Sequence, residues 1–336
     1  LKIELLEQSV IQFGNKGRMQ CPQTEADQMI SSDLDAGSLL RPLASQHHRR
    51  VQVTGGTANA VLAFPGSASI GGGNVARSLI GGLIADGVPA ARLEASEPDP
   101  VRRAALEREF GVRVTTDNAA AAAAAGVVVL AVKPQIMAGV ARGLAASLAG
   151  RETLVISVAA GIRSSDLARW LGGEVAIVRA MPNTPALLGC GATALYAAPG
   201  VTAMQRERAE FILRAVGSVN WVEDEAHMDA VTALSGSGPA YFFLLIEAMA
   251  DGATALGLPA DLARLLALET ALGAARMAIE SEEDIAALRH QVTSPGGTTE
   301  AALAALEAGG FRALVTTALA RAEARSRELA DSFGKE

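Results

Sequence analysis

The sequence predicts an α/β domain followed by an all-helical domain. Short β-branched runs alternate with helix-like segments from residue 61 to about residue 223, and the strand signal disappears after Trp221. From Glu225 onward Ala, Leu and Glu dominate, with Gly and Pro breaks between helices. Near-continuous apolar strands separated by helices are typical of a parallel sheet that is covered on both faces. We therefore expect a first domain at 61–223 and a second at 224–336.

Composition disfavours several classes of function. The chain has 336 residues, of which 50% are hydrophobic and 4% aromatic, and its net charge is −7. An acidic chain has no cationic excess with which to bind nucleic acid or an anionic membrane. The longest membrane-like stretch, Ala119 to Val132, is shorter than the roughly 18 apolar residues of a spanning helix. Only two cysteines, and a start without a signal-peptide pattern, favour the cytoplasm.

Residues 1–60 differ from the rest of the chain. They contain His47, His48 and several Gln, and they show no sustained period of 2 or 3.6 residues. Two interpretations stay open: an unstructured or artefactual extension, or an arm that packs on a neighbouring molecule. The histidines of the chain, which include His227 and His290, share no ligand spacing, so no metal site is expected.

Four β-branched runs mark the expected sheet, with helix-like segments between them. The expected strands are Val112–Thr115, Val127–Val132, Thr153–Val158 and Val175–Val178, and the helices include Arg102–Phe110 and Ala138–Leu148. The first strand is anomalous, because Phe64–Ile70 contains Pro and Gly, which weaken a central strand. Either Val61–Phe64 supplies this strand with a longer loop, or the strand is degraded and the site that it supports is impaired.

A glycine-rich turn follows this strand. Residues 71–76 read G-G-G-N-V-A and fit the pattern G-x-G-x-x-A, ahead of an expected helix at Ala76–Ile84. In this pattern the glycines permit a tight turn and a close approach of pyrophosphate, whose charge lies on backbone N–H groups at the helix start. The first domain is therefore expected to be a Rossmann-type dinucleotide-binding domain. The residues expected at the pyrophosphate are Gly71, Gly73, Asn74, Val75 and Ala76.

The adenosine ribose is normally read at the end of the second strand, about 20 residues further on. Here Ser96 and Glu97 make opposite predictions, because a hydroxyl can bind a 2′-phosphate whereas a carboxylate favours a free 2′-OH. Arg102 and Arg103 could compensate the carboxylate or be plain solvated charges. The residues therefore leave NADH and NADPH as equal alternatives.

Five short segments carry the most specific signal in the chain. They are Ala131–Gln135, Ala159–Ile162, Met181–Pro185, Asp229–Tyr241 and Val292–Glu300. Together they resemble the pyrroline-5-carboxylate reductase family, in order and spacing, and the resemblance extends from Ile70 to about Phe333. It implies a Rossmann-type domain followed by a helical dimerisation domain that interlocks with its twofold mate. It also implies reduction of 1-pyrroline-5-carboxylate to L-proline with NAD(P)H, the last step of proline biosynthesis, in a homodimer or a homodecamer.

The segment Ser294–Glu300 is suited to hold a carboxylate. A Gly-rich turn that leads into a helix presents free backbone N–H groups to an anion, and Glu300 suits the first helical turn. The family resemblance implies that a set of residues in this turn binds the substrate: Ser294, Gly296, Gly297, Thr298 and Thr299.

Thr299 and Glu282 are the candidate catalytic residues implied by the resemblance. The Thr299 hydroxyl would contact the ring nitrogen, and Glu282 would hold the ring amine or order water. Because a threonine is not a strong acid, we interpret the role of Thr299 as orientation and proton relay from water.

Other residues are expected on the cofactor side of the site. Lys133 ends a strand at the carboxyl edge of the sheet, where ligands bind in such folds, although a capping or packing charge is an equal alternative. Asn118 matches a family position near the adenosine, with helix N-capping as the alternative. Ser235–Pro239 interrupts a helix, either to admit the nicotinamide ring or to kink the helix for dimer packing. The set expected beyond the glycine-rich turn is Ser96, Asn118, Ala131, Val132, Lys133, Pro134, Ala159, Gly161 and Asn183.

Two other functions stay open. The anomalous first strand would suit a non-catalytic or cofactor-impaired dimeric paralogue, and the substrate half would also suit a reductase of another cyclic imine. A hydroxyacid dehydrogenase is disfavoured, because such enzymes usually need a catalytic lysine in the helical domain and residues 225–300 contain none.

Overall fold

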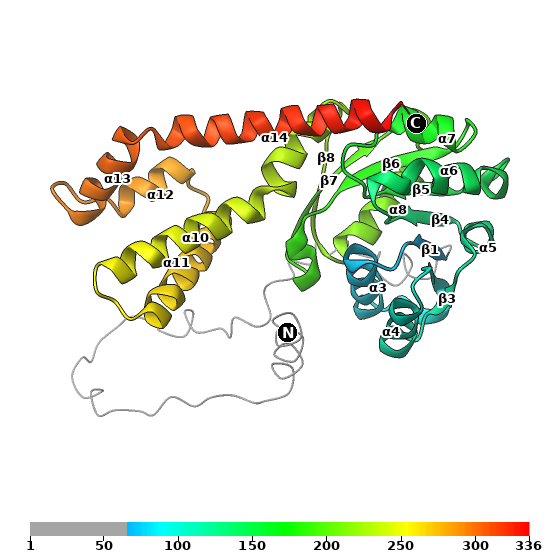
Figure 1. Cartoon of the computed structure of the whole chain (residues 1–336), viewed down its shortest axis with the longest axis horizontal. Helices are drawn as coiled ribbons and strands as arrows, with labels where there is room; N and C mark the ends of the chain where they lie inside the picture. Colours follow the sequence, from blue (N-terminus) through cyan, green and yellow to red (C-terminus); the bar gives the residue numbers. More distant parts are fainter. Residues whose placement is uncertain (1–65, 336) are drawn as a thin grey trace, which may run out of the picture. The chain divides into compact units, whose positions relative to one another are not determined.

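The computed structural model describes residues 66–335. The expectations for residues 1–60, and the alternative strand at Val61–Phe64, lie outside the described residues. Within 66–335, an eight-stranded sheet with its covering helices precedes a run of helices in which no further strand occurs (Figure 1). The predicted order of an α/β half followed by a helical half is confirmed.

The sheet has the strand order β3-β2-β1-β4-β5-β6-β7-β8. Its strands are β1 (Ser67–Ile70), β2 (Leu93–Ser96), β3 (Arg113–Thr115), β4 (Val127–Leu130), β5 (Leu154–Ser157), β6 (Ala176–Met181), β7 (Gly191–Ala197) and β8 (Gly217–Trp221). β1 pairs in parallel with both β2 and β4, so the direction in which strands are added reverses at β1. In such a sheet the crevice outside the carboxyl ends of the strands at this reversal is the usual ligand site.

β1 forms despite its unusual composition. All four of its residues are buried, and each is in register with one residue of β2 and one of β4. The small side chains admit the alanine-rich helix α5 (Asn118–Ala124), because Ala68 shares a buried cluster with Ala121 and Ala122. The small residues therefore serve close packing, and the alternative of a degraded first strand does not hold.

Helices cover both faces of the sheet (Figure 1). On one face α3 (Asn74–Ala85), α4 (Pro100–Phe110) and α8 (Ala203–Arg214) bury their apolar residues in one cluster. On the other face α5, α6 (Pro134–Leu148) and α7 (Ser164–Trp170) share a second cluster. Alternate residues of β4 enter the two clusters, as expected for a sheet buried on both sides.

The last two strands are not predicted by the sequence. β7 is antiparallel to β6, and β8 is parallel to β7. β7 reads G-A-T-A-L-Y-A and carries few of the β-branched residues that mark the other strands. Gly217 lies so close to Gly191 that a Cβ on Gly217 would overlap the Gly191 backbone, so glycine is required where these two strands meet.

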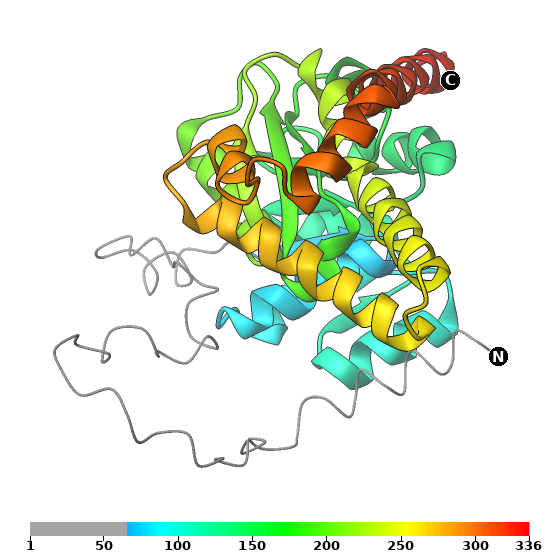
Figure 2. The ribbon, with the colours of Figure 1, turned by 90° about the vertical axis from the view of Figure 1, so that its left-hand side faces the viewer.

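The helical half consists of one broken helix followed by four more. Its elements are α9 (His227–Val231), the π-helical turn η4 (Thr232–Gly236), α10 (Gly238–Ala255), α11 (Ala260–Glu280), α12 (Ile285–Gln291), α13 (Thr298–Ala308) and α14 (Phe311–Phe333). η4 is the predicted interruption before Pro239, and the other breaks fall at glycines and prolines that the sequence marks, except the one between α11 and α12, at residues 281–284, which contains neither. α10 and α11 pack side by side (Figure 2).

Most of this half is uncovered in the single chain. When burial is measured among the described residues, Gly238 is the one buried residue of α10, and α12 and α13 have no buried residue. Large apolar side chains are exposed instead, such as Phe242 at 64% and Phe243 at 65%. By length and composition His227–Ala255 is apolar enough to cross a membrane, so the expectation that Ala119 to Val132 is the longest membrane-like stretch is wrong. Apolar surface of this kind marks an interaction surface.

The last helix returns to the α/β half. The Ser326 hydroxyl, which is buried, donates to Asp229 Oδ1 at 2.6 Å, and Arg169 donates to the Gly334 carbonyl at 2.6 Å. The end of α14 is thereby fixed against α9 and α7 (Figure 1).

Candidate active site

The glycine-rich turn follows β1 directly and is shaped by backbone contacts. Gly71 has φ +103°, and a Cβ there would lie 2.6 Å from the Ala131 carbonyl oxygen, so no other residue fits. The Gly71 N–H donates to the Ser96 carbonyl at 2.8 Å. The turn is thus held between the ends of β2 and β4.

Gly73 faces open space, whereas a Cβ on Gly72 would lie 2.9 Å from Leu106 Cδ1. Gly73 is the N-cap residue of α3, has no side-chain cap, and would place a Cβ with no atom within 4 Å. The first N–H groups of α3 therefore point into an open cradle, which fits a pyrophosphate at a helix N-terminus. The residues expected there, Gly71, Gly73, Asn74, Val75 and Ala76, form this turn and the start of α3.

The residues that follow β4 line the same crevice. The Ala131 N–H donates to the Ile70 carbonyl at 2.9 Å, and Val132 Cγ1 would contact a Cβ on Gly71. Lys133 is the N-cap residue of α6, but its side chain makes no capping hydrogen bond, and Pro134 is the first residue of that helix. The structure thus places Ala131 and Val132 at the glycine-rich turn, and the exposed Lys133 side chain has no hydrogen-bond or ion-pair partner among residues 66–335.

Ser96 and Asn118, both expected near the adenosine, contact each other. The buried Ser96 hydroxyl donates to Asn118 Oδ1 at 2.6 Å. The alternative of Asn118 as a helix cap is wrong, because Asp117 accepts the N–H groups of Ala119 and Ala120 and caps α5. Asn118 also borders an open hollow of about 520 Å³ between the start of α5 and α6.

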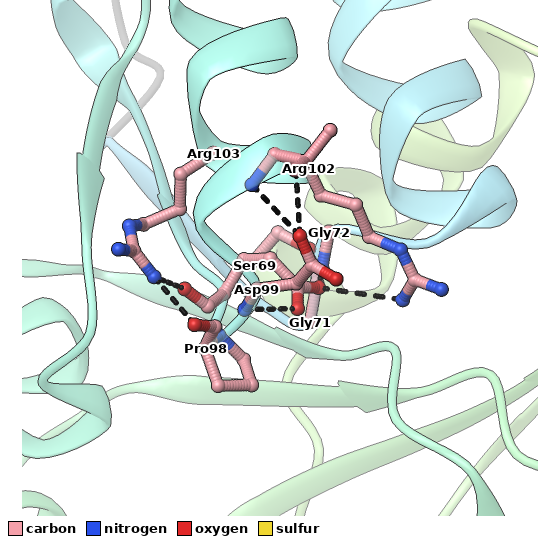
Figure 3. Close-up of polar contacts among 9 residues, drawn as sticks. Ser69, Gly71, Gly72, Pro98, Asp99, Arg102 and Arg103 are labelled. Atoms are coloured by element: carbon pink, nitrogen blue, oxygen red, sulfur yellow. Dashed lines mark hydrogen bonds and ion pairs between the residues drawn. The ribbon is translucent and has the colours of Figure 1, made fainter.

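Glu97 lies against the glycine-rich turn. It is 4% exposed, and its Oε2 accepts the Gly72 N–H at 2.7 Å while its Oε1 accepts the Asp99 N–H at 3.0 Å. Asp99 caps α4 by accepting the N–H groups of Arg102 and Val101, and these hydrogen bonds lower the pKa of Asp99. Figure 3 shows these contacts between the second strand and the turn.

The two arginines of this loop differ in their contacts. Arg103 Nη1 donates to the carbonyl oxygens of Glu97 and Pro98, each at 2.7 Å. Arg102 lies 4.0 Å from Glu97 Oε2, with its side chain 62% exposed. Arg103 is therefore a brace of the loop, whereas Arg102 is a solvated charge beside a carboxylate (Figure 3).

Gly161 and Asn183 make contacts that the sequence does not predict. Gly161 has φ +69°, and a Cβ there would meet Leu329 and Ala330 of α14, whereas the nearby Ala159 is buried. Asn183 donates to the Ser235 carbonyl at 3.1 Å and accepts the Ala192 N–H at 2.9 Å. The Asn183 amide thus ties the loop after β6 to η4.

The expected anion-binding turn leads into α13. Gly296 has φ +68°, its N–H donates to Glu300 Oε2 at 2.6 Å, and the Gly297 N–H donates to the Ser294 carbonyl at 3.0 Å. Gly297 caps α13 without a side-chain bond. Within the described chain the hydroxyls of three residues have no hydrogen-bond partner and stay available to a ligand: Ser294, Thr298 and Thr299.

Glu282 lies before α12, whereas the anion-binding turn follows that helix. The seven residues of α12 separate them by a rise of about 10 Å. Glu282 is exposed, and its carboxylate has no partner among the described residues. Residues 66–335 also contain no group of three His, Cys, Asp or Glu side chains that could hold a metal ion.

A glycine-rich turn at the reversal point of a largely parallel sheet is the geometry of a dinucleotide-binding domain. A family model described as "NADP oxidoreductase coenzyme F420-dependent" matches residues 68–161, and one described as "Pyrroline-5-carboxylate reductase dimerisation" matches residues 225–329. The pyrroline-5-carboxylate reductase of Pseudomonas aeruginosa is 54% identical over 274 residues, which cover 82% of this chain and 100% of that relative. The chain belongs to the pyrroline-5-carboxylate reductase family.

Other relatives and solved structures support this family assignment. The Pisum sativum pyrroline-5-carboxylate reductase is 44% identical and is matched over 77% of this chain and 94% of its own length. The solved structure from Coxiella burnetii has a TM-score of 0.77 and 45% identity, covering 79% of this chain and 98% of that one. A Plasmodium falciparum structure with NADP bound has a TM-score of 0.71 at 28% identity, with the same two coverages.

Proposed function

We propose that this protein reduces 1-pyrroline-5-carboxylate to L-proline by hydride transfer from NAD(P)H, in the last step of proline biosynthesis. The observation that carries the proposal is the turn before α13, which offers three unpartnered hydroxyls and open helix-start N–H groups to a carboxylate, as far as the described residues go. This turn occurs in a chain whose relatives, at 41–54% identity, are named for that reaction. The protein is thus an oxidoreductase that acts on a C=N bond.

The α/β half holds the nucleotide. The N–H groups at the start of α3 bind the pyrophosphate, the end of β2 and the start of α5 face the adenosine, and Ala131 to Pro134 border the crevice. Ala159, Gly161 and Asn183 shape the wall toward the helical half. The bound dinucleotide supplies the hydride.

The turn before α13 holds the substrate. Ser294, Thr298 and the N–H groups at the start of α13 anchor its carboxylate away from the path of the hydride, while the N–H groups of Gly296 and Gly297 bond Glu300 and Ser294 and hold the turn in shape. The Thr299 hydroxyl bonds the ring nitrogen and passes a proton to it from water. Glu282 orders that water or holds the ring amine. Protonation of the nitrogen makes the substrate an iminium, which accepts hydride at carbon more readily.

The apolar helical half is covered by a second copy. We propose a homodimer in which the helical domains, residues 224–336, interlock. Residues 61–223 form the nucleotide-binding domain. The dimers assemble further into a decamer. The exposed apolar residues of α10 and α11, which lie in the region matched by the dimerisation family, support this. Burial against the second copy also explains why a soluble, cytoplasmic enzyme has the apolar stretch His227–Ala255.

The experiment is a steady-state assay of the full chain with 1-pyrroline-5-carboxylate and each reduced nucleotide. We expect consumption of the nucleotide that depends on this substrate and exceeds that with a pyrroline whose carboxylate is missing. Thr299→Ala lowers kcat/KM at least tenfold, which corresponds to about 1.4 kcal/mol at the transition state. Thr254→Ala is the control, because the Thr254 hydroxyl bonds only the Ala250 carbonyl in its own helix.

The remaining alternatives are decided by the same assay. A protein that binds the nucleotide but leaves 1-pyrroline-5-carboxylate unchanged is not this reductase. Faster turnover of another cyclic imine would assign the protein to that substrate instead. The intact β1 removes the reason to expect an impaired cofactor site.

A further inference from the structure

The end of β2 carries one fixed negative charge beside the glycine-rich turn. Both carboxylate oxygens of Glu97 are held by backbone N–H groups, one from Gly72 at 2.7 Å and one from Asp99 at 3.0 Å. The residue is 4% exposed, so the carboxylate cannot turn toward solvent without leaving two donors behind. A carboxylate at this point of a dinucleotide-binding fold accepts hydrogen bonds from the adenosine ribose hydroxyls.

The hydroxyl that could have bound a 2′-phosphate is already engaged. Ser96 donates its single proton to Asn118 Oδ1 at 2.6 Å and is 1% exposed. A serine hydroxyl has one proton to donate, so Ser96 cannot also donate to a phosphate oxygen while this bond is kept.

The two arginines do not form a phosphate site either. Arg103 is braced by two backbone carbonyls at 2.7 Å, which fixes its Nη1 on the loop itself. Arg102 is solvated, and the acceptor that it approaches is Glu97, at 4.0 Å. A 2′-phosphate beside this loop would meet the buried carboxylate of Glu97 and would have to draw Arg102 away from it.

We infer that Glu97 is the residue that sets the nucleotide preference of this chain, and that it makes the chain favour NADH over NADPH. The inference rests on the proposed function, because it concerns the cofactor of that site. Arg102 opposes Glu97 only in part, since it is largely exposed to water.

The test measures binding rather than turnover. The dissociation constants of NADH and NADPH for the full-length protein are measured by nucleotide fluorescence, without substrate, at one ionic strength. We expect the Kd for NADPH to be at least tenfold higher than the Kd for NADH. In the Glu97→Gln variant, which keeps an acceptor for Gly72, we expect this ratio to fall at least tenfold, mainly because NADPH binds more tightly.

Two further variants separate the local charge from general effects. Glu94→Gln removes a carboxylate from the same strand, but Glu94 pairs with Arg113 at 3.1 Å and faces away from the turn, so the ratio should change less than twofold. Arg102→Gln should raise the Kd for NADPH more than the Kd for NADH, because it removes the cation that partly offsets Glu97.

Three results would overturn the inference. The first is a wild-type chain that binds NADPH as tightly as NADH, which is measured without any variant. The second is a Glu97→Gln ratio that equals the wild-type ratio in a protein with an unchanged melting temperature. The third is binding of neither nucleotide, which would also contradict the proposed function. Proline formation by a chain that does not prefer NADH would contradict this inference alone.

Discussion

Gly71 and Gly73 stand two residues apart and are required for different reasons. At Gly71 the left-handed backbone and the nearby Ala131 carbonyl exclude any side chain, so the constraint comes from the protein itself. At Gly73 a side chain would enter open space, so the constraint would come from the bound nucleotide. Gly71 is therefore required for folding, whereas Gly73 is required for nucleotide binding.

Replacing these glycines with alanine distinguishes the two constraints. Gly71→Ala should destabilise the protein by about 1–3 kcal/mol and abolish nucleotide binding, because the backbone must shift. Gly73→Ala should keep the wild-type melting temperature within about 2 °C and weaken nucleotide binding at least tenfold. Thermal unfolding and nucleotide titration of the two variants check this. Equal effects of both variants would contradict it.

Much of the site at residue level could be predicted from the sequence. The glycine-rich turn, Ser96 and Asn118 are marked by motif and spacing, and the structure brings Ser96 and Asn118 together. What the sequence could not decide is the side-chain geometry. Glu97 turns inward to Gly72, which depends on a backbone N–H 25 residues away and leaves no pattern in the chain.

At the scale of elements, an ion pair between a buried arginine and a partly buried glutamate joins the sheet to the start of the helical half. Glu225, just before α9, accepts from Arg179 of β6 at 2.8 Å and from the Ser164 N–H at the start of α7 at 2.7 Å. The Ser164 hydroxyl bonds the other carboxylate oxygen at 2.7 Å. Three elements thus meet on one carboxylate, which the positive end of α7 also stabilises.

Protonation of Glu225 should lower the stability of the protein in acid. Burial raises the pKa of Glu225, but the hydrogen bonds from Ser164 and Arg179 outweigh burial and hold this pKa below its usual value of 4.5. The stability that this lowered pKa contributes is present above pH 4.5 and is lost as the pH falls from 4.5 through the native pKa.

The Glu225→Gln variant measures this contribution. It leaves Arg179 buried without its partner, so the free energy of unfolding at pH 7 should fall by about 3 kcal/mol, and the acid dependence between about pH 5 and 3 should flatten. Urea unfolding across that pH range checks both effects. Glu223→Gln is the matched control, because Glu223 is 87% exposed. A variant as stable as the wild type at pH 7 would show that the ion pair contributes nothing.

The elements that the sequence misses have a physical reason in common. β7 and β8 lie toward one edge of the sheet, with Gly and Ala where backbones approach, so β-branched content cannot mark them. The π-helical turn η4 is predicted only as a break, since glycine and proline mark an interruption but not its hydrogen bonding. The helical character of the segments on either side, α9 and α10, is predicted.

At the scale of the whole molecule, the two halves are linked by contacts far apart in the sequence. Arg169 of α7 donates to the Gly334 carbonyl after α14, across 165 residues, and Ser326 of α14 bonds Asp229, at the start of the helical half, across 97 residues. No periodicity or motif predicts such pairings, although the order of the two halves could be predicted. The exposed apolar side chains of α10 and α11 remain uncovered by any of these contacts.

The protein should therefore be at least a dimer in solution. Phe243→Lys, in α10, places a charge on the uncovered surface, where a paired copy would bury it without a partner. We expect light scattering to find the wild type at twice the chain mass or more, and the variant as monomer or aggregate. Met204→Lys, at a 59% exposed apolar residue of α8, should leave the mass unchanged. A monomeric wild type would contradict the proposed assembly.

The central claim is that this chain makes L-proline from 1-pyrroline-5-carboxylate. The most direct measurement incubates the purified full chain with the substrate and a reduced nucleotide, and quantifies L-proline by amino-acid analysis against nucleotide consumed. The account predicts equimolar amounts of L-proline and oxidised nucleotide, and at least a tenfold slower reaction with Thr299→Ala, equivalent to about 1.4 kcal/mol. Nucleotide binding without any L-proline would contradict it.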